Sequence, residues 1–126
     1  MGAELNKSYS MLFGDIHNHN AMGYGVGSLE RSIDVAQGHL DFFAFTGHSS
    51  WHDMKAMEGG RENHWLNGFE VLRNGWPKVQ DLIAEANSDG EFAAYLGFEW
   101  HSSQFGDQCV VFPDDHQPMA YPDHLN

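Results

Sequence analysis

The stretch DFFAFT at residues 41–46 decides the fold. Its apolar side chains form a short, nearly unbroken run, which is typical of a strand buried on both faces of a parallel sheet. Three further segments predict strands: residues 11–18, 92–98 and 109–112. The polar residues that follow Thr46, starting with Gly47, predict a loop at the end of the central strand.

Apolar residues with helical spacing occupy the first two of the three intervals between these strands. Residues 28–38 predict a helix that begins at the N-cap Ser28 and ends at a glycine. Residues 62–87 predict a longer helical stretch, interrupted at Gly75 and Pro77 into two helices or a kinked one. Strands that alternate with helices predict an α/β fold with a parallel sheet, and we expect residues 1–126 to form a single domain.

Composition restricts the partners of the chain. With 18 Asp and Glu against 6 Lys and Arg, the formal net charge is −12, so nucleic acids and anionic membrane surfaces would repel it. A single cysteine excludes an internal disulfide and a cysteine-rich zinc site. No apolar run has the length of a membrane span, and no basic leader precedes the first strand, so we expect a cytoplasmic protein.

Nine histidines are many for 126 residues, and several of them follow predicted strands. His17 and His19 alternate at the end of the first strand, so both imidazoles face the same side. His48 follows the central strand, and Glu99 follows the third; His101, two residues further on, is either an extra ligand or a loop residue. Because the carboxyl ends of parallel strands share one edge, these groups are expected to meet around a metal ion there.

Three motifs resemble those of the polymerase and histidinol phosphatase (PHP) superfamily. They are Asp-Ile-His-Asn-His at residues 15–19, Phe-Thr-Gly-His at residues 45–48 and Gly-Phe-Glu-Trp at residues 97–100. The residues that flank these motifs look most like those of a PHP-like branch, the DUF3604 group. The resemblance spans about residues 11–112 and rests on the three motifs taken together.

This resemblance implies a distorted (β/α)7 TIM-like barrel, of which the chain would supply the N-terminal half. It implies two or three divalent ions (zinc, manganese or iron) at the C-terminal mouth, and hydrolysis of a phosphate ester by a metal-bound hydroxide. His17 and His19 would bind the first ion, Glu99 would bridge two ions, and His48 would belong to a third position. Asp107 is the candidate for a further ligand before the last strand.

The catalytic group carried over in this way is Glu99, His48 and Asp15. Two departures weaken the match: Gly47 replaces the aspartate of the second motif, and residues 20–27 lack the usual His or Asp of a third metal position. Four strands cannot close a barrel, so we expect the rest of the same polypeptide to be a partner and the fragment alone to be inactive.

Two other functions stay open. An amidohydrolase also begins with His-x-His, but its bridging ligand is commonly a modified lysine on a later strand, and Lys78 lies in a predicted helix. A degenerate PHP-like module that binds without catalysis is supported by Gly47. The identities of the substrate and the metal, and the oligomeric state, do not follow from the sequence.

Overall fold

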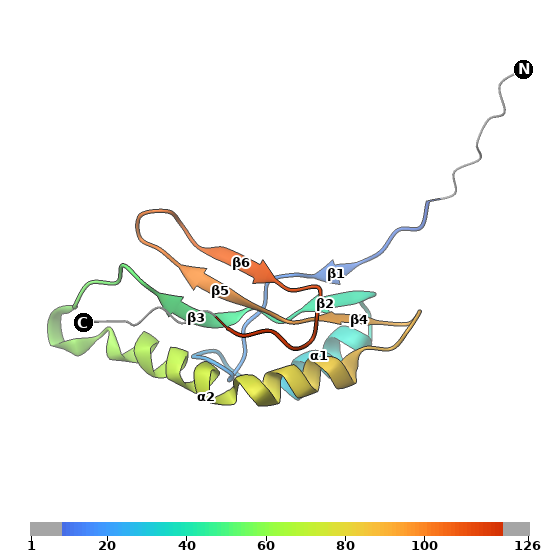
Figure 1. Cartoon of the computed structure of the whole chain (residues 1–126), viewed down its shortest axis with the longest axis horizontal. Helices are drawn as coiled ribbons and strands as arrows, with labels where there is room; N and C mark the ends of the chain where they lie inside the picture. Colours follow the sequence, from blue (N-terminus) through green and yellow to red (C-terminus); the bar gives the residue numbers. More distant parts are fainter. Residues whose placement is uncertain (1–8, 120–126) are drawn as a thin grey trace, which may run out of the picture.

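The computed structural model of the chain describes residues 9–119, whose helices and strands are labelled in Figure 1. In chain order the elements are β1 (Gly14–Asp15), α1 (Leu29–Gln37), β2 (Phe42–Ala44), β3 (Gly47–Trp51), the short 3₁₀ turn η1 (Glu58–Gly60), α2 (Asn63–Ala86), β4 (Ala93–Tyr95), β5 (Gly97–His101) and β6 (Gln108–Val111).

The strands form two three-stranded sheets. The sheets adjoin, because β2 of the first leads directly into β3 of the second, and β4 leads directly into β5. In the first sheet β2 lies between β1 and β4, and all three strands are parallel. In the second sheet β5 lies between β3, to which it is parallel, and β6, to which it is antiparallel. The N–H of Phe45 donates to the carbonyl of Tyr95 at 3.0 Å, so pairing continues from β2–β4 into β3–β5.

The α/β class is therefore confirmed, but two details of the predicted arrangement are wrong. β6, which the parallel arrangement would include, runs antiparallel to β5, and the loop at residues 102–107 joins the two strands. The loop predicted after Thr46 is instead strand β3, in which the hydroxyl of buried Ser49 donates to the carbonyl of Glu99 at 2.8 Å. Within residues 9–119 both sheets are open, and no closed barrel is present.

Both predicted helices form, and the second is continuous. The hydroxyl of Ser28 accepts a hydrogen bond from the N–H of Arg31 at 3.2 Å, and α1 ends at Gly38 as expected. α2 runs through Pro77 without an interruption. Pro77 is exposed, whereas its neighbours Trp76 and Val79 are buried, so packing of the inner face holds the helix together across the proline.

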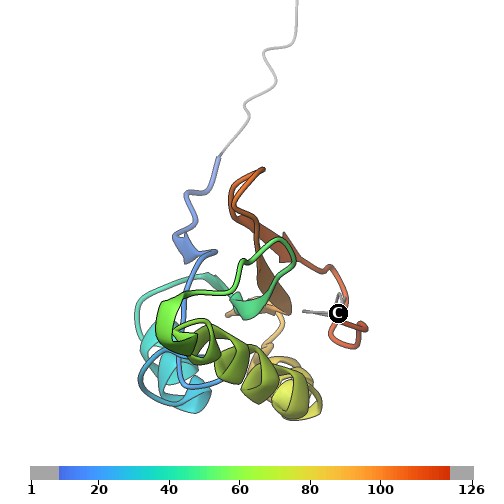
Figure 2. The same cartoon turned by 90° about the vertical axis from the view of Figure 1, so that its left-hand side faces the viewer.

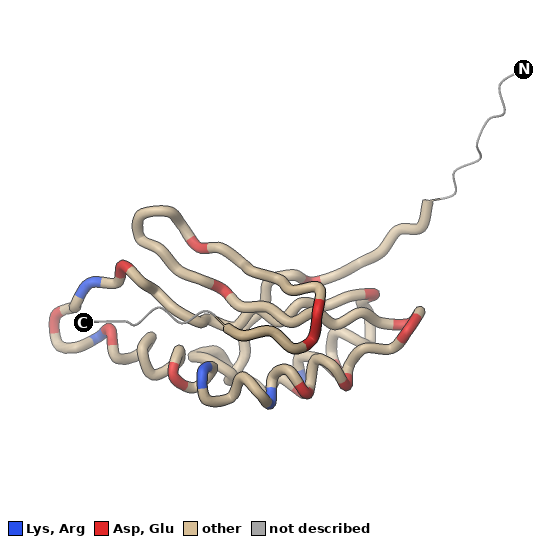
Figure 3. The backbone as a smooth tube through the Cα atoms, in the orientation of Figure 1, with Lys and Arg blue, Asp and Glu red and all other residues tan. Residues whose placement is uncertain are grey.

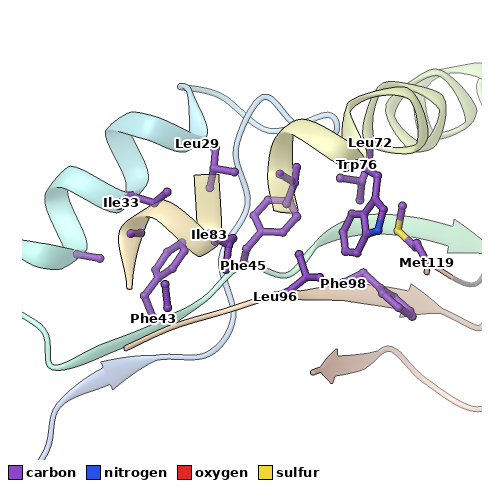
Figure 4. Packing of buried hydrophobic residues seen from close by; sticks show 14 of the residues in the cluster. Leu29, Ile33, Phe43, Phe45, Leu72, Trp76, Ile83, Leu96, Phe98 and Met119 are labelled. Atoms are coloured by element: carbon purple, nitrogen blue, oxygen red, sulfur yellow. The ribbon is translucent and has the colours of Figure 1, made fainter. Parts of the chain in front are cut away.

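The two helices cover the same face of the sheets, and the core lies between them and the strands (Figures 1 and 2). Figure 4 shows Phe43 and Phe45 of the central segment pointing toward Ile83 of α2. Each of these three side chains is at most 2% exposed, and burying a side chain of this size contributes roughly 1.5–3 kcal/mol. This core holds the strand ends that carry the polar residues.

Acidic side chains are spread over the helices and loops, as Figure 3 shows. α2 has the length of a bilayer span but carries many polar and charged residues, and no helix within residues 9–119 is apolar enough to cross a membrane. Two histidines, His116 and His124, follow the last predicted strand, where a surface position is expected. His116 is exposed, and His124 lies outside the described residues.

Candidate metal centre

Four imidazoles and one carboxylate meet beyond the ends of the parallel strands β1, β2 and β4. His17 and His19 follow β1, His48 lies in β3 beyond β2, and Glu99 and His101 lie in β5 beyond β4. His48 and Glu99 are direct partners in the β3–β5 pairing. The carboxyl edge predicted from the sequence is therefore where the structure brings these side chains together.

The first group contains His17, His19 and Glu99. The Nε2 atoms of the two imidazoles lie 3.1 Å apart. Nε2 of His17 lies 3.9 Å from Oε1 of Glu99, and Nε2 of His19 lies 3.5 Å from Oε2. Ligand atoms around a tetrahedral zinc ion, each about 2.0–2.1 Å from the metal, are roughly 3.3 Å from one another. The group has the donor set and the spacing of such a site.

The second group contains His48, Glu99 and His101. Nδ1 of His48 lies 2.7 Å from Oε2 of Glu99 and 2.6 Å from Nε2 of His101, and the latter nitrogen lies 3.7 Å from the same carboxylate oxygen. Both groups thus use Glu99. Oε2 of Glu99 faces nitrogens of both groups, and Oε1 faces His17 of the first, so the carboxylate is placed where it could contact two cations.

Oε2 of Glu99 is buried and accepts no hydrogen bond, although His48 lies within 2.7 Å of it. The side chain of Glu99 is only 7% exposed. A buried carboxylate oxygen without a donor is costly unless a cation compensates it. Nδ1 of His19 is likewise buried without a partner. The residues present therefore fit a divalent metal held by nitrogen and oxygen ligands.

The pKa values of these groups follow from their burial and mutual proximity. Burial, followed by the neighbouring imidazoles, lowers the pKa of His48 to about 3, and the same causes lower the pKa of His19. Burial raises the pKa of Glu99 against the opposing influence of His101 and His17. His48 is therefore neutral at pH 7, so its contact with Glu99 is not an ion pair, and a neutral imidazole is the form that binds metals.

Asp107 and Asp15, predicted at the site, lie outside both groups. Oδ1 of Asp107 lies 3.1 Å from Nδ1 of His101, the ring nitrogen opposite the one that approaches Glu99. Oδ1 of Asp15 accepts a hydrogen bond from the backbone N–H of His17 at 2.9 Å. Asp107 thus lies behind a candidate ligand, and carboxylates in such positions orient metal-binding imidazoles. Asp15 contacts the backbone of His17 rather than its ring.

His101 and Cys109 take closer roles than the sequence indicated. His101 follows Glu99 by two residues in β5, and this alternation was the signal that it shares the face of Glu99. Cysteine is among the residue types most often buried, but Cys109 is exposed, and its Sγ lies 2.7 Å from Nδ1 of His17. The antiparallel pairing of Cys109 with Glu99 brings it there, and sequence reasoning had no signal for that register.

Tyr24 was not singled out by its sequence context. Its ring stacks on the imidazole of His48, with centroids 3.9 Å apart and planes 9° apart. Its hydroxyl lies 3.4 Å from Nε2 of His101. Burial, then the charges of Glu99 and Asp107, raise the pKa of Tyr24, so its phenol keeps its proton at neutral pH.

Two cavities lie away from these groups. One, of about 570 Å³, is lined mainly by residues 87–93 with Leu12 and Asp41, and the other, of about 310 Å³, lies between β1 and α1 beside Arg31. The metal-ligand geometry, rather than cavity size, identifies the candidate site. Comparison of the chain with protein-family models, curated proteins and solved structures finds no match.

Proposed function

We propose that this chain binds two divalent transition-metal ions through groups that share Glu99, and that it serves hydrolysis of phosphate esters. The proposal rests on the surroundings of Glu99. Its Oε2 atom is buried without a hydrogen bond, and one nitrogen from each of four imidazoles lies within 3.9 Å of its carboxylate. The three PHP-like motifs at residues 15–19, 45–48 and 97–100 support the same assignment.

Each residue has a defined task in this proposal. His17 and His19 hold one ion, His48 and His101 hold the other, and Glu99 contacts both. Ions bound here would lower the pKa of coordinated water and stabilise negative charge on a phosphoryl group. The side chain of His17 is 49% exposed, so the first group is open to a substrate from solvent.

A module that binds metal without catalysis is the second candidate. Gly47, which replaces the aspartate of the PHP motif, is buried in β3. A Cβ atom there would lie 2.5 Å from Cζ of Phe45, so an aspartate is excluded unless that core ring moves. The loss of a potential ligand at this position is thus coupled to packing of the core, which is consistent with either function.

The amidohydrolase alternative has less support. The ammonium of Lys78 lies 2.6 Å from the carboxylate of Glu30, pairing α2 with α1 on their exposed surface. A bridging lysine would need to reach the metal-facing side of the imidazoles. Glu99 occupies the bridging position in the geometry proposed here.

Metal content tests the proposal directly. We expect elemental analysis of the purified chain after loading with Zn²⁺ or Mn²⁺ to give two ions per chain, and Glu99→Ala to remove both. Glu85→Ala is the matched control, because it removes an exposed glutamate from α2. Retention of two ions by Glu99→Ala would exclude Glu99 as the shared ligand.

A screen with phosphomonoesters and phosphodiesters separates the two candidate functions. Turnover that requires metal and disappears in Glu99→Ala would support the hydrolase. Because this chain alone is expected to be inactive, the screen is made on a polypeptide that also contains the rest of the predicted barrel. Two bound ions without turnover of either ester class by that polypeptide would favour the binding module.

A further inference from the structure

The segment at residues 20–27 is folded back against the metal-binding groups. The N–H of Ala21 donates to the carbonyl of Gly27 at 2.7 Å, and the side chain of Asn20 accepts from the N–H of Met22 at 3.0 Å. Asn20 itself is only 2% exposed. The segment is therefore held by its own hydrogen bonds, and it carries Tyr24 to a defined place.

Helix α2 contains a notch for this tyrosine. A Cβ atom at Gly68 would lie 2.5 Å from Cδ1 of Tyr24 and 3.0 Å from its Cβ. Glycine in a helix interior lowers helix stability by about 1 kcal/mol relative to alanine. At Gly68 the absence of a side chain allows the tyrosine ring to approach the helix closely. The ring of Tyr24 also stacks on the imidazole of His48, with centroids 3.9 Å apart.

The hydroxyl of Tyr24 consequently lies at the metal-facing nitrogen of His101, at 3.4 Å. We infer that the phenol of Tyr24 donates a hydrogen bond to an oxygen of a phosphoryl group bound at the group formed by His48, Glu99 and His101. This inference rests on the proposed function and adds a substrate-contacting residue to it. A neutral donor suits this place, because it stabilises an anionic oxygen without repelling the cations.

Tyr24→Phe tests the inference, because it removes the hydroxyl and keeps the ring that packs against His48 and Gly68. Two quantities are measured on the Mn²⁺-loaded chain: the number and affinity of bound ions, and the dissociation constant of inorganic phosphate by calorimetry. We expect unchanged metal binding and phosphate binding that is weaker by roughly tenfold or more, as for loss of a hydrogen bond to a charged group.

Two alanine variants of α2 form a matched pair. Gly68→Ala forces the ring of Tyr24 away from its place, so it should weaken phosphate binding as Tyr24→Phe does, with metal retained. Gly75→Ala meets only the terminal methyl of Met22, a flexible side chain that can move, so it should leave phosphate binding within about twofold. Both changes raise helix propensity equally.

Each other outcome overturns the inference. Unchanged phosphate affinity in Tyr24→Phe would show that the phenol is not a donor, and loss of metal in that variant would make Tyr24 a ligand or a structural support. Wild-type protein that binds metal but no phosphate would overturn this inference alone. Wild-type protein that binds no metal would overturn the proposed function as well.

Discussion

The carboxylate of Asp107 reaches Nδ1 of His101 at 3.1 Å, while Nε2 of the same ring approaches Glu99. If Asp107 orients His101 rather than binding metal, Asp107→Ala should weaken metal affinity by about 10- to 100-fold without changing the number of ions at saturation. Competition with a chelator of known affinity measures this change.

Asp81→Ala is the control for that variant, since it removes an exposed aspartate from α2 at the same cost in charge. Loss of one ion at saturating metal would instead make Asp107 a ligand, as the sequence suggested. The two roles could not be separated from the sequence, because they depend on which ring nitrogen the loop at residues 102–107 approaches.

Asp53 gives a pH-dependent prediction away from the ligands. Burial alone would raise its pKa, but donors from Ser103, Ser102 and Gln104 at 2.8, 2.9 and 3.0 Å outweigh it and lower the pKa from 3.8 to about 2. A lowered folded-state pKa means that the stabilisation is present above the unfolded value and is lost as pH falls from about 4 to about 2.

Asp53→Ala should therefore melt at a lower temperature than wild type at pH 7, and the gap should close as the pH approaches 2. Thermal unfolding followed by circular dichroism at several pH values measures both curves. A gap that is the same at pH 7 and pH 2 would exclude the ionised carboxylate as its source.

At the scale of elements, helix α1 depends on the Ser28 cap, whose hydroxyl accepts the N–H of Arg31 at 3.2 Å. Ser28→Ala should reduce the free energy of unfolding by about 1 kcal/mol, which corresponds to roughly 4 °C in melting temperature for a chain of this size. Ser28→Asp keeps a capping oxygen and should melt close to wild type. Equal losses in both variants would contradict a capping role.

The elements that periodicity predicts well are those whose burial follows a simple rule. Leu29, Ile33 and Ala36 of α1 are all buried, as their helical spacing requires. Strand β3 was not predicted because it lacks an apolar pattern. Its polar residues Ser49 and Ser50 are fully buried, and hydrogen bonds satisfy their hydroxyls there. Local sequence does not report partners that lie 50 residues away.

The continuity of α2 escaped prediction for a related reason. A proline in a helix interior usually ends or kinks the helix, and Pro77 has that cost. Tertiary packing of Trp76, Val79 and Ile83 against the strands outweighs it. The direction of β6 is a third such case, since an apolar run predicts a strand but not whether it runs parallel or antiparallel.

For the molecule as a whole, the acidic net charge and the candidate metal centre both affect the free energy of unfolding. A net charge of −12 repels itself in the compact state, and the buried carboxylate of Glu99 adds a desolvation cost. Divalent cations anywhere near the surface reduce the repulsion among the acidic charges. They offset the desolvation cost of Glu99 only when they bind at the candidate metal centre. Glu99→Gln and Glu85→Gln change the net charge equally, so the difference between them isolates the centre.

Metal-dependent unfolding of these variants is the resulting prediction. Zn²⁺ or Mn²⁺ at about 100 times its dissociation constant should stabilise wild type by about 2.7 kcal/mol per ion, a rise of roughly 10 °C in melting temperature for one ion. Glu85→Gln should show the same rise, and Glu99→Gln should show little of it. In excess chelator the order should reverse, with Glu99→Gln at least as stable as wild type, because the glutamine no longer buries a charge without a donor. Equal rises in all three proteins would mean that the cations act only on surface charge, and a Glu99→Gln variant that is less stable in chelator would mean that the carboxylate has a structural partner within the fold.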